Sequence, residues 1–123
     1  MILVDTSIWI DHIRSPDPLL SQLLSDDQVL GHGFVMGELA LGSIGQREAV
    51  LAAYRQLPRA IVAEHEEVLH LIGQHRLFGR GIGYVDVHLL ASALLIPDAR
   101  LWSRDRRLAA AAEALGVAAR VTN

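Results

Sequence analysis

The stretch that decides the fold is Met1-Ile2-Leu3-Val4-Asp5-Thr6-Ser7, an apolar run that ends in one acid and two hydroxyl residues. Four consecutive apolar residues are typical of a short strand buried in a parallel sheet. A helical segment through residues 8–13 follows at once, and Thr6 or Ser7 is the expected N-cap hydroxyl. Asp5 should therefore stand at the carboxyl end of a strand, the edge of an open parallel sheet at which functional groups gather.

The remainder of the chain alternates short apolar runs with amphipathic segments. Further strands are predicted at residues 28–31, 61–63, 101–103 and 117–122. Further helices are predicted from Asp17-Pro18 onward and at residues 34–44, 46–57, 66–78, 85–95 and 105–115. Strands that alternate with helices in this way predict one α/β domain over residues 1–123, with a parallel sheet covered by helices on both faces.

Composition limits the classes of protein to which the chain can belong. With 123 residues, it can bury one core but hardly two. No window approaches the roughly 18 to 20 apolar residues of a spanning helix, and no secretory signal precedes the first strand, so we expect a soluble, cytoplasmic protein. The absence of Cys excludes disulfides, thiol catalysis and thiolate zinc sites. All 11 basic residues are Arg, which excludes every mechanism that depends on lysine.

Three more acids stand out by their positions. Asp105 lies just beyond the predicted strand 101–103, Asp86 is in the first turn of a predicted helix, and Glu38 has mostly apolar neighbours. Each acid taken alone has a structural alternative, such as a turn or a favourable charge at a helix N-terminus. Together with Asp5 they would repel one another strongly at one edge unless they were protonated or neutralised by a divalent cation. A site with oxygen ligands alone favours Mg²⁺ or Mn²⁺.

Four segments of the chain carry a resemblance to a known family. They are Val4-Asp5-Thr6-Ser7-Ile8-Trp9-Ile10, Gly37-Glu38-Leu39-Ala40-Leu41-Gly42, Val85-Asp86-Val87-His88-Leu89-Leu90-Ala91-Ser92-Ala93 and Ser103-Arg104-Asp105-Arg106-Arg107-Leu108. In order and spacing they resemble the four acidic motifs of PIN-domain ribonucleases, and more narrowly the VapC toxins of bacterial VapBC toxin–antitoxin modules. The resemblance covers nearly the whole chain. It implies a three-layer α/β/α PIN-like domain with a parallel sheet of about five strands.

The resemblance also implies an activity, a site and partners. The implied metal-binding and catalytic acids are Asp5, Glu38, Asp86 and Asp105, with Thr6 and Ser103 as supporting hydroxyls. The implied reaction is endonucleolytic cleavage of RNA by a water that Mg²⁺ or Mn²⁺ activates. The implied partners are RNA, a small VapB-like antitoxin and a second copy of the chain in a homodimer. An apolar excess in the N-terminal helices, which is more than one small core can readily cover, agrees with docking of such partners.

Arginines close to the acids are candidate contacts for RNA phosphates. They are Arg104, Arg106 and Arg107, which flank Asp105, and Arg76 and Arg80, which precede Asp86. The arginine fork suits phosphate oxygens, although a solvated helix face is the alternative for each. Charge along the chain permits one basic rim, because residues 1–75 hold 4 Arg against 10 acids and residues 76–123 hold 7 Arg against 4 acids.

The six histidines suggest no metal site. His65, His70 and His75 recur every five residues, so they do not share a helix face. Surface or capped core positions are expected for the other three, His12, His32 and His88.

Other functional classes compete with the nuclease interpretation. Receiver domains and haloacid-dehalogenase-like phosphatases also gather acids around a metal, but both depend on a lysine that this chain lacks. A noncatalytic PIN-fold module that only binds a protein partner is the remaining alternative. A binding platform gives no reason to keep four repelling carboxylates, which favours the nuclease.

Overall fold

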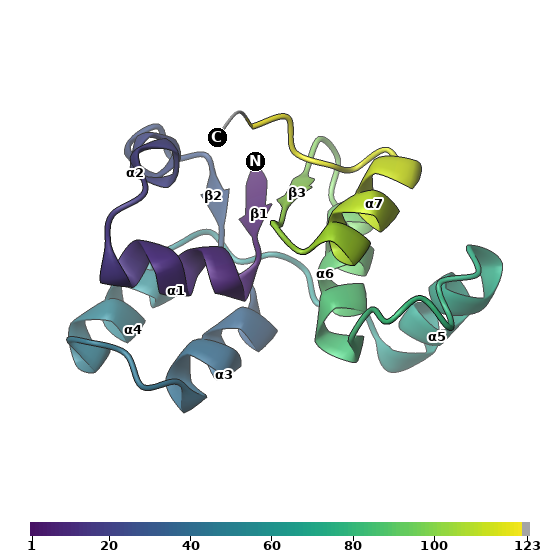
Figure 1. Ribbon diagram of the computed structural model, residues 1–123, viewed down its shortest axis with the longest axis horizontal. Helices are drawn as coiled ribbons and strands as arrows, with labels where there is room; N and C mark the ends of the chain where they lie inside the picture. The colour runs from purple at the N-terminus through teal and green to yellow at the C-terminus, as the bar shows by residue number, and fades with distance from the viewer. Residues whose placement is uncertain (122–123) are drawn as a thin grey trace.

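The N-terminal strand lies in the centre of a parallel sheet. A computed structural model describes residues 1–121 and contains strands β1 (Ile2–Val4), β2 (Val29–Leu30) and β3 (Arg100–Trp102) in the order β2-β1-β3. Both neighbours of β1 run parallel to it, and Val4 pairs with Trp102. The sheet therefore joins segments from the two ends of the chain (Figure 1).

The sheet has three strands instead of the expected five or so. In place of the predicted strands 61–63 and 117–122, the described part of the chain forms two single parallel bridges, Gly31 with Arg59 and Leu101 with Ala118. Residue 122 of the last predicted strand lies outside the described residues.

Exposure explains why the strand at 61–63 does not form. Ile61 is 59% exposed and Val62 is 40% exposed, so these β-branched side chains bury little surface against the sheet. The chain at 58–60 is instead joined to Gly31, just after β2, by two backbone hydrogen bonds. Gly31 N–H donates to the Pro58 carbonyl, and Ala60 N–H donates to the Gly31 carbonyl.

Seven helices surround the sheet in the described residues. They are α1 (Thr6–Arg14), α2 (Pro18–Ser25), α3 (Gly33–Leu41), α4 (Arg47–Arg55), α5 (His65–Gln74), α6 (Tyr84–Leu95) and α7 (Arg106–Ala114). Each corresponds to a predicted helix, with shifted ends. The helix predicted at 66–78 already ends at Gln74, because Arg76 adopts a left-handed backbone with φ of 52°.

Helix caps agree with the sequence at one helix and differ at another. Asp17 caps α2 as predicted, because its side chain accepts hydrogen bonds from the backbone N–H groups of Leu19 and Leu20. The expected hydroxyl cap of α1 is wrong. Its N-cap is Asp5, whose side chain makes no capping hydrogen bond.

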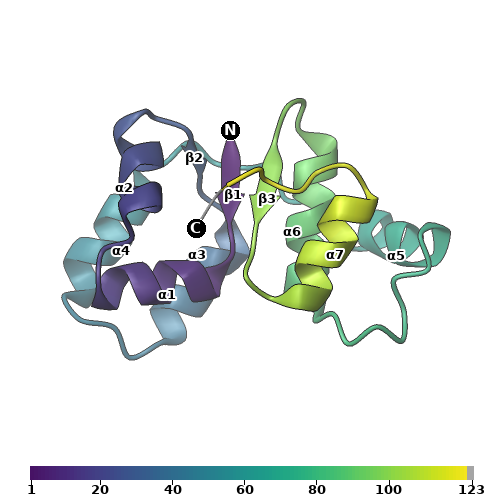
Figure 2. The ribbon, with the colours of Figure 1, turned by 45° about the horizontal axis from the view of Figure 1, so that its top comes forward.

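The helices lie on both sides of the sheet, which confirms the predicted α/β class. Figures 1 and 2 show α1 to α4 on one side of the strands and α5 to α7 on the other. The core between them includes fully buried Leu3, Val4, Leu90 and Leu108. Within residues 1–121, we find no helix with the length and apolar character that crossing a bilayer requires.

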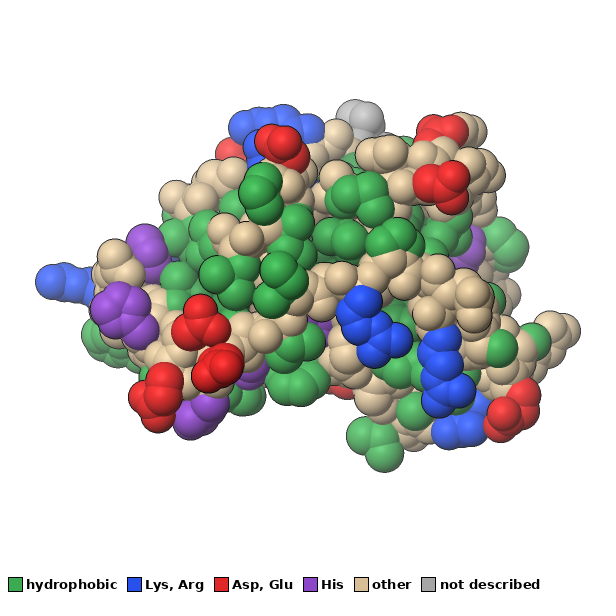
Figure 3. Space-filling model, turned by 180° about the vertical axis from the view of Figure 1, so that it is seen from behind, with side chains coloured by type: hydrophobic (Ala, Val, Ile, Leu, Met, Phe, Trp, Pro, Cys, Tyr) green, Lys and Arg blue, Asp and Glu red, His purple; other side chains and the backbone are tan. Residues whose placement is uncertain are grey.

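Charged side chains of both signs are distributed over the back of the molecule. Figure 3 shows acidic and histidine side chains gathered at the end formed by α5, and arginines at the end formed by α4, with apolar side chains between them. Figure 3 also shows arginines at the left and upper edges of this view, so this face presents no continuous basic surface.

Candidate acidic active site

Asp5 lies at the carboxyl end of β1, where the sequence predicted it. Its backbone N–H donates to the Trp102 carbonyl at 3.0 Å, which continues the pairing of β1 with β3 by one residue. Its side chain is buried, and Oδ2 accepts a hydrogen bond from Ser103 Oγ at 2.8 Å. A buried carboxylate is thereby fixed in orientation by a hydroxyl from the neighbouring strand end.

Glu38 is connected to the residue after Asp5. It lies in α3 with an exposed side chain, and its Oε1 accepts a hydrogen bond from Thr6 Oγ1 at 2.6 Å. The Thr6 hydroxyl is therefore directed across to α3 instead of capping its own helix. The two predicted supporting hydroxyls, Thr6 and Ser103, each contact one of the predicted acids.

Asp105 combines a structural role with its place at the site. It is the N-cap of α7, and its Oδ1 accepts hydrogen bonds from the backbone N–H groups of Arg107 and Leu108. Its own backbone N–H donates to Ser103 Oγ at 3.0 Å. Ser103 therefore links Asp105 to Asp5, the first and last of the four predicted acids.

Asp86 is the third residue of α6, and its environment records the other three acids. Burial and, after it, the negative charges of Asp5, Asp105 and Glu38 together raise its pKa from an ordinary 3.8 to about 6. Three segments far apart in sequence thus bring their carboxylates within electrostatic reach of Asp86. Asp86 does not cap its helix, because the N-cap is Gly83.

The chemistry of these side chains fits a hard divalent cation. All four offer carboxylate oxygens, which are the ligands that Mg²⁺ and Mn²⁺ prefer. Burial is the largest cause of the raised pKa of Asp86, and the negative charges that add to it are ones that a cation would neutralise. Among residues 1–121, no group of three His, Asp or Glu side chains is already arranged to hold an ion. The fit therefore rests on the donor set and its charge.

The candidate phosphate-binding arginines differ in their surroundings. Arg104 forms ion pairs with Asp17 at 2.6 Å and with Asp11 at 3.5 Å, so those acids compete with RNA for its side chain. Arg107 lies against the backbone of Gly81, where an added Cβ would be 2.8 Å from Nη1. This contact places Arg107 beside the loop that leads into the Asp86 helix. Arg76, Arg80 and Arg106 are exposed.

Sequence reasoning missed how His32 is used. It is 1% exposed and caps α3, because its Nδ1 accepts from the backbone N–H of Phe34 at 3.0 Å. The other ring nitrogen, Nε2, therefore carries the proton and donates to Ser92 Oγ at 2.9 Å. Burial lowers the pKa of His32 to about 4, so the ring stays neutral. The sequence feature that could have indicated burial of His32 is the buried-strand pattern at 28–31, which immediately precedes it.

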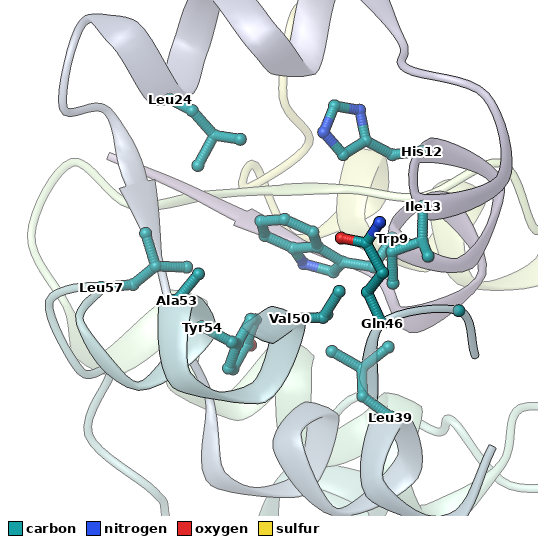
Figure 4. Close-up of a pocket in the computed structure, with 11 residues that line it drawn as sticks. Trp9, His12, Ile13, Leu24, Leu39, Gln46, Val50, Ala53, Tyr54 and Leu57 are labelled. Carbon is teal, nitrogen blue, oxygen red and sulfur yellow. The ribbon is translucent and has the colours of Figure 1, made fainter. Parts of the chain in front are cut away.

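An apolar pocket lies among α1 to α4. Its volume is about 460 Å³, and Trp9, Leu24, Leu39, Val50 and Tyr54 are among the residues that line it. Figure 4 shows the Trp9 ring in its middle, above the side chains that α4 contributes. Among the described residues, Trp9 Nε1 is buried without a hydrogen-bond partner.

Comparison with known proteins gives the family. A profile of the PIN domain matches residues 2–114, nearly the whole chain. The chain is 53% identical over 118 residues to ribonuclease VapC32 of Mycobacterium tuberculosis, in strain CDC 1551 / Oshkosh and equally in strain ATCC 25618 / H37Rv. The chain belongs to the PIN-domain VapC ribonuclease family. The match covers 96% of this VapC-family chain and 95% of each relative, so the predicted PIN-like fold and family are confirmed.

Proposed function

We propose that this VapC-family chain is a Mg²⁺- or Mn²⁺-dependent endoribonuclease that acts as the toxin of a type II toxin–antitoxin module. The observation that carries the proposal is the gathering of four carboxylates from separate segments: Ser103 joins Asp5 to Asp105 by hydrogen bonds, and the charges of Asp5, Asp105 and Glu38 all act on Asp86. Groups of like charge are costly to hold together, and a carboxyl group with a raised pKa among them is typical of functional sites. The names of the relatives, ribonuclease VapC32, support the same activity.

Four acids would hold the metal ion. Asp5 and Asp86 are proposed as direct ligands, while Glu38 and Asp105 bind directly or through water, because Mg²⁺ keeps several of its waters. When bound, the ion supplies a water of lowered pKa and offsets negative charge on the phosphate. The acids hold the ion rather than attack the RNA themselves.

The remaining residues of the site orient these carboxylates. Ser103 fixes one oxygen of Asp5 through its hydroxyl hydrogen bond, and Thr6 fixes one oxygen of Glu38. Such partners restrict the rotation of metal-binding carboxylates and thereby reduce the entropy lost on binding. We propose Arg80, Arg106 and Arg107 as contacts for RNA phosphates. Arg104 remains a weaker candidate because Asp11 and Asp17 already pair with it.

A small VapB-like antitoxin is the proposed regulator, and a homodimer the proposed assembly. The apolar pocket around Trp9 offers a place for the apolar face of a helix. The carboxylates would attract a basic side chain of the same partner in place of the metal.

Cleavage by the purified chain tests the nuclease proposal. Total RNA is incubated with the chain and Mg²⁺ or Mn²⁺, and new 5′ ends are mapped across the RNA. We expect discrete cuts that disappear in excess EDTA and in Asp5→Ala, and that fall by orders of magnitude in Asp86→Asn. Asp98→Asn makes the same chemical change at an exposed loop position and should cut normally. Full activity in EDTA, or undiminished cleavage by folded Asp86→Asn, would refute the proposal.

A further inference from the structure

Two large aromatic side chains remain exposed beside the acids. The chain has only six Phe, Trp and Tyr residues, and the structure buries Trp9, Tyr54 and Trp102. Phe34 and Tyr84, in contrast, are 36% and 44% exposed. Each lies in the first turn of a helix that carries a site acid, α3 for Phe34 and α6 for Tyr84.

Both exposed rings are held on one buried imidazole. The ring centroid of His88 lies 4.5 Å from that of Phe34 and 4.8 Å from that of Tyr84, with interplanar angles of 73° and 86°. His88 is 3% exposed. The Tyr84 hydroxyl is also hydrogen-bonded to His65 Nδ1 from α5. Both exposed rings thus contact His88, and Tyr84 is also held by His65. Rings that are already held in place lose less conformational entropy when a ligand stacks on them.

The buried imidazole at this position is costly for the fold. Its Nδ1 has no hydrogen-bond partner among residues 1–121. A buried polar atom without a partner destabilises the folded state, and an apolar side chain would fill the same space without that penalty. His88 packs against both exposed rings in spite of this penalty.

The two rings adjoin the acidic site through their helices. Phe34 precedes Glu38 by four residues in α3, so the two side chains lie one above the other on the same helix face. Tyr84 precedes Asp86 by two residues in α6, and Glu38 contributes to the raised pKa of Asp86. Tyr84 and Asp86, two residues apart, point to different faces of α6. The ring pair is therefore connected to the acids through Phe34, which lies one helical turn from Glu38 and shares the contact with His88.

We propose that Phe34 and Tyr84 form a stacking shelf for an unpaired nucleobase of RNA, next to the phosphodiester held at the acids. This inference rests on the proposed ribonuclease function and adds the substrate class, an RNA strand whose bases are splayed out of a helix. A base stacks on an aromatic face only after it leaves a duplex, and single-stranded RNA is recognised in this way. His88 acts as a positioning residue, because it holds the rings and does not itself touch the base.

Binding of a short RNA tests the shelf without any cleavage. The probe is a fluorescein-labelled decauridylate, titrated by anisotropy in EDTA at fixed ionic strength, and a decamer of abasic ribose phosphates serves as the matched ligand without bases. We expect Phe34→Leu and Tyr84→Leu to weaken decauridylate binding by about 10-fold. Neither variant should change binding of the abasic decamer, because that ligand has no base for the ring to stack on, so the effects of removing the ring and removing the base are not additive.

Two further variants control for the hydroxyl and for exposed aromatics in general. Tyr84→Phe keeps the ring but loses the hydrogen bond to His65, and it should recover most of the affinity for decauridylate that Tyr84→Leu loses, since stacking requires only the π-face. Phe78→Leu removes an exposed aromatic side chain outside the shelf and should also bind normally. Two outcomes would overturn the shelf if Phe34→Leu and Tyr84→Leu are folded. In one, they bind decauridylate normally; in the other, they lose as much affinity for the abasic decamer as for decauridylate.

Ultraviolet cross-linking of the unaltered chain to decauridylate keeps the proposal testable if the leucine variants do not fold. The cross-linked peptide should contain Phe34 or Tyr84, and cross-links confined to other peptides would overturn the shelf.

The experiments distinguish failure of the shelf from failure of the nuclease proposal. Ring-dependent binding by a chain that cuts no RNA supports the shelf and refutes the nuclease. Metal-dependent cutting with ring-independent binding refutes the shelf and leaves the nuclease intact.

Discussion

The side chains of Ser103 and Asp5, 98 positions apart in the chain, are joined by a hydrogen bond in which Ser103 Oγ donates to Asp5 Oδ2 at 2.8 Å. The same hydroxyl oxygen accepts from the backbone N–H of Asp105. One serine therefore sets the relative positions of two proposed metal-binding acids, across the junction of β1 with β3.

Loss of this hydroxyl should impair catalysis more than stability. We predict that Ser103→Ala lowers kcat/KM for RNA cleavage by roughly 10-fold or more, the usual effect of removing a group that orients a metal ligand. Ser103→Thr should restore most of the activity because it returns the hydroxyl. Steady-state cleavage with Mg²⁺ measures both, and Ser25→Ala on the surface of α2 is the control. Equal loss in the Thr and Ala variants would contradict this role.

Asp86 should make the metal-free chain less stable as the pH rises. Its pKa is about 6 in the folded chain and near 3.8 when unfolded, so between these values the folded state binds more protons. The free energy of unfolding then falls as the pH increases from about 4 to about 6. Asp86→Asn removes this effect, and in EDTA it should be more stable than the unaltered chain at pH 7.5 by about 1–3 kcal/mol, but not at pH 4.

Urea unfolding at the two pH values measures this difference. Asp98→Asn serves as the control for a simple loss of one negative charge. An advantage of Asp86→Asn that is the same at pH 4 and pH 7.5 would show that the pKa of Asp86 is not raised in the folded chain.

The sequence predicted those parts of the site that depend on local pattern. In a parallel α/β fold, the apolar run before Asp5 is expected as a buried strand, and the apolar segment around Asp86 as a helix packed on the sheet. The direction of the Thr6 hydroxyl could not be predicted in the same way, because it depends on where α3 crosses α1. The same holds for Arg104, whose partner Asp17 lies 87 positions away.

The missing edge strands have a related cause. The segment 61–63 is apolar and β-branched at two positions, which is a strand pattern, but Ile61 and Val62 are exposed to solvent. Burial depends on the neighbouring helices, and local composition does not report it. The contacts of His88 with Phe34 and Tyr84 escaped prediction for the same reason, since they join two helices far apart in sequence.

Arginines near the site should differ in their contribution to RNA binding. Arg106→Gln and Arg107→Gln should each weaken single-stranded RNA binding and reduce the slope of log K against log salt concentration by about 0.7. Arg104→Gln should change the slope less and lower stability instead, because its side chain pairs with Asp17. Salt titrations of the three variants test this order, and a full reduction of the slope in Arg104→Gln would reverse our assignment.

The antitoxin should depend on the acids for part of its affinity. We predict an inhibitor with an apolar helix followed by a segment that contains at least one Arg or Lys, obtained by pull-down from the native host. Its affinity should fall in Glu38→Gln and in Asp105→Asn, which keeps the capping side chain of α7. Glu113→Gln in α7 is the matched control on the exposed surface. Titration at fixed ionic strength measures the affinities, and unchanged binding by both site variants would refute this docking.

The chain should form a homodimer. Several large apolar side chains remain exposed within residues 1–121, among them Leu41, Leu69, Phe78, Leu94 and Leu95. Exposure of apolar surface to water is unfavourable in free energy, and a second subunit commonly covers such surface. Sedimentation equilibrium at micromolar concentration should therefore give twice the mass of 13.4 kDa. A mass that stays at the monomer value would exclude the dimer in that range.

The central place of β1 has a consequence for the order of events during protein synthesis. The ribosome makes β1 first, yet β3, which pairs with it, follows almost a hundred residues later. Until that segment emerges, Asp5 lacks the hydroxyl of Ser103 and the site lacks Asp105. A nascent chain therefore carries an incomplete acidic site for most of its translation. The interval between synthesis of Asp5 and completion of the site is set by translation speed, at about 5–20 residues per second.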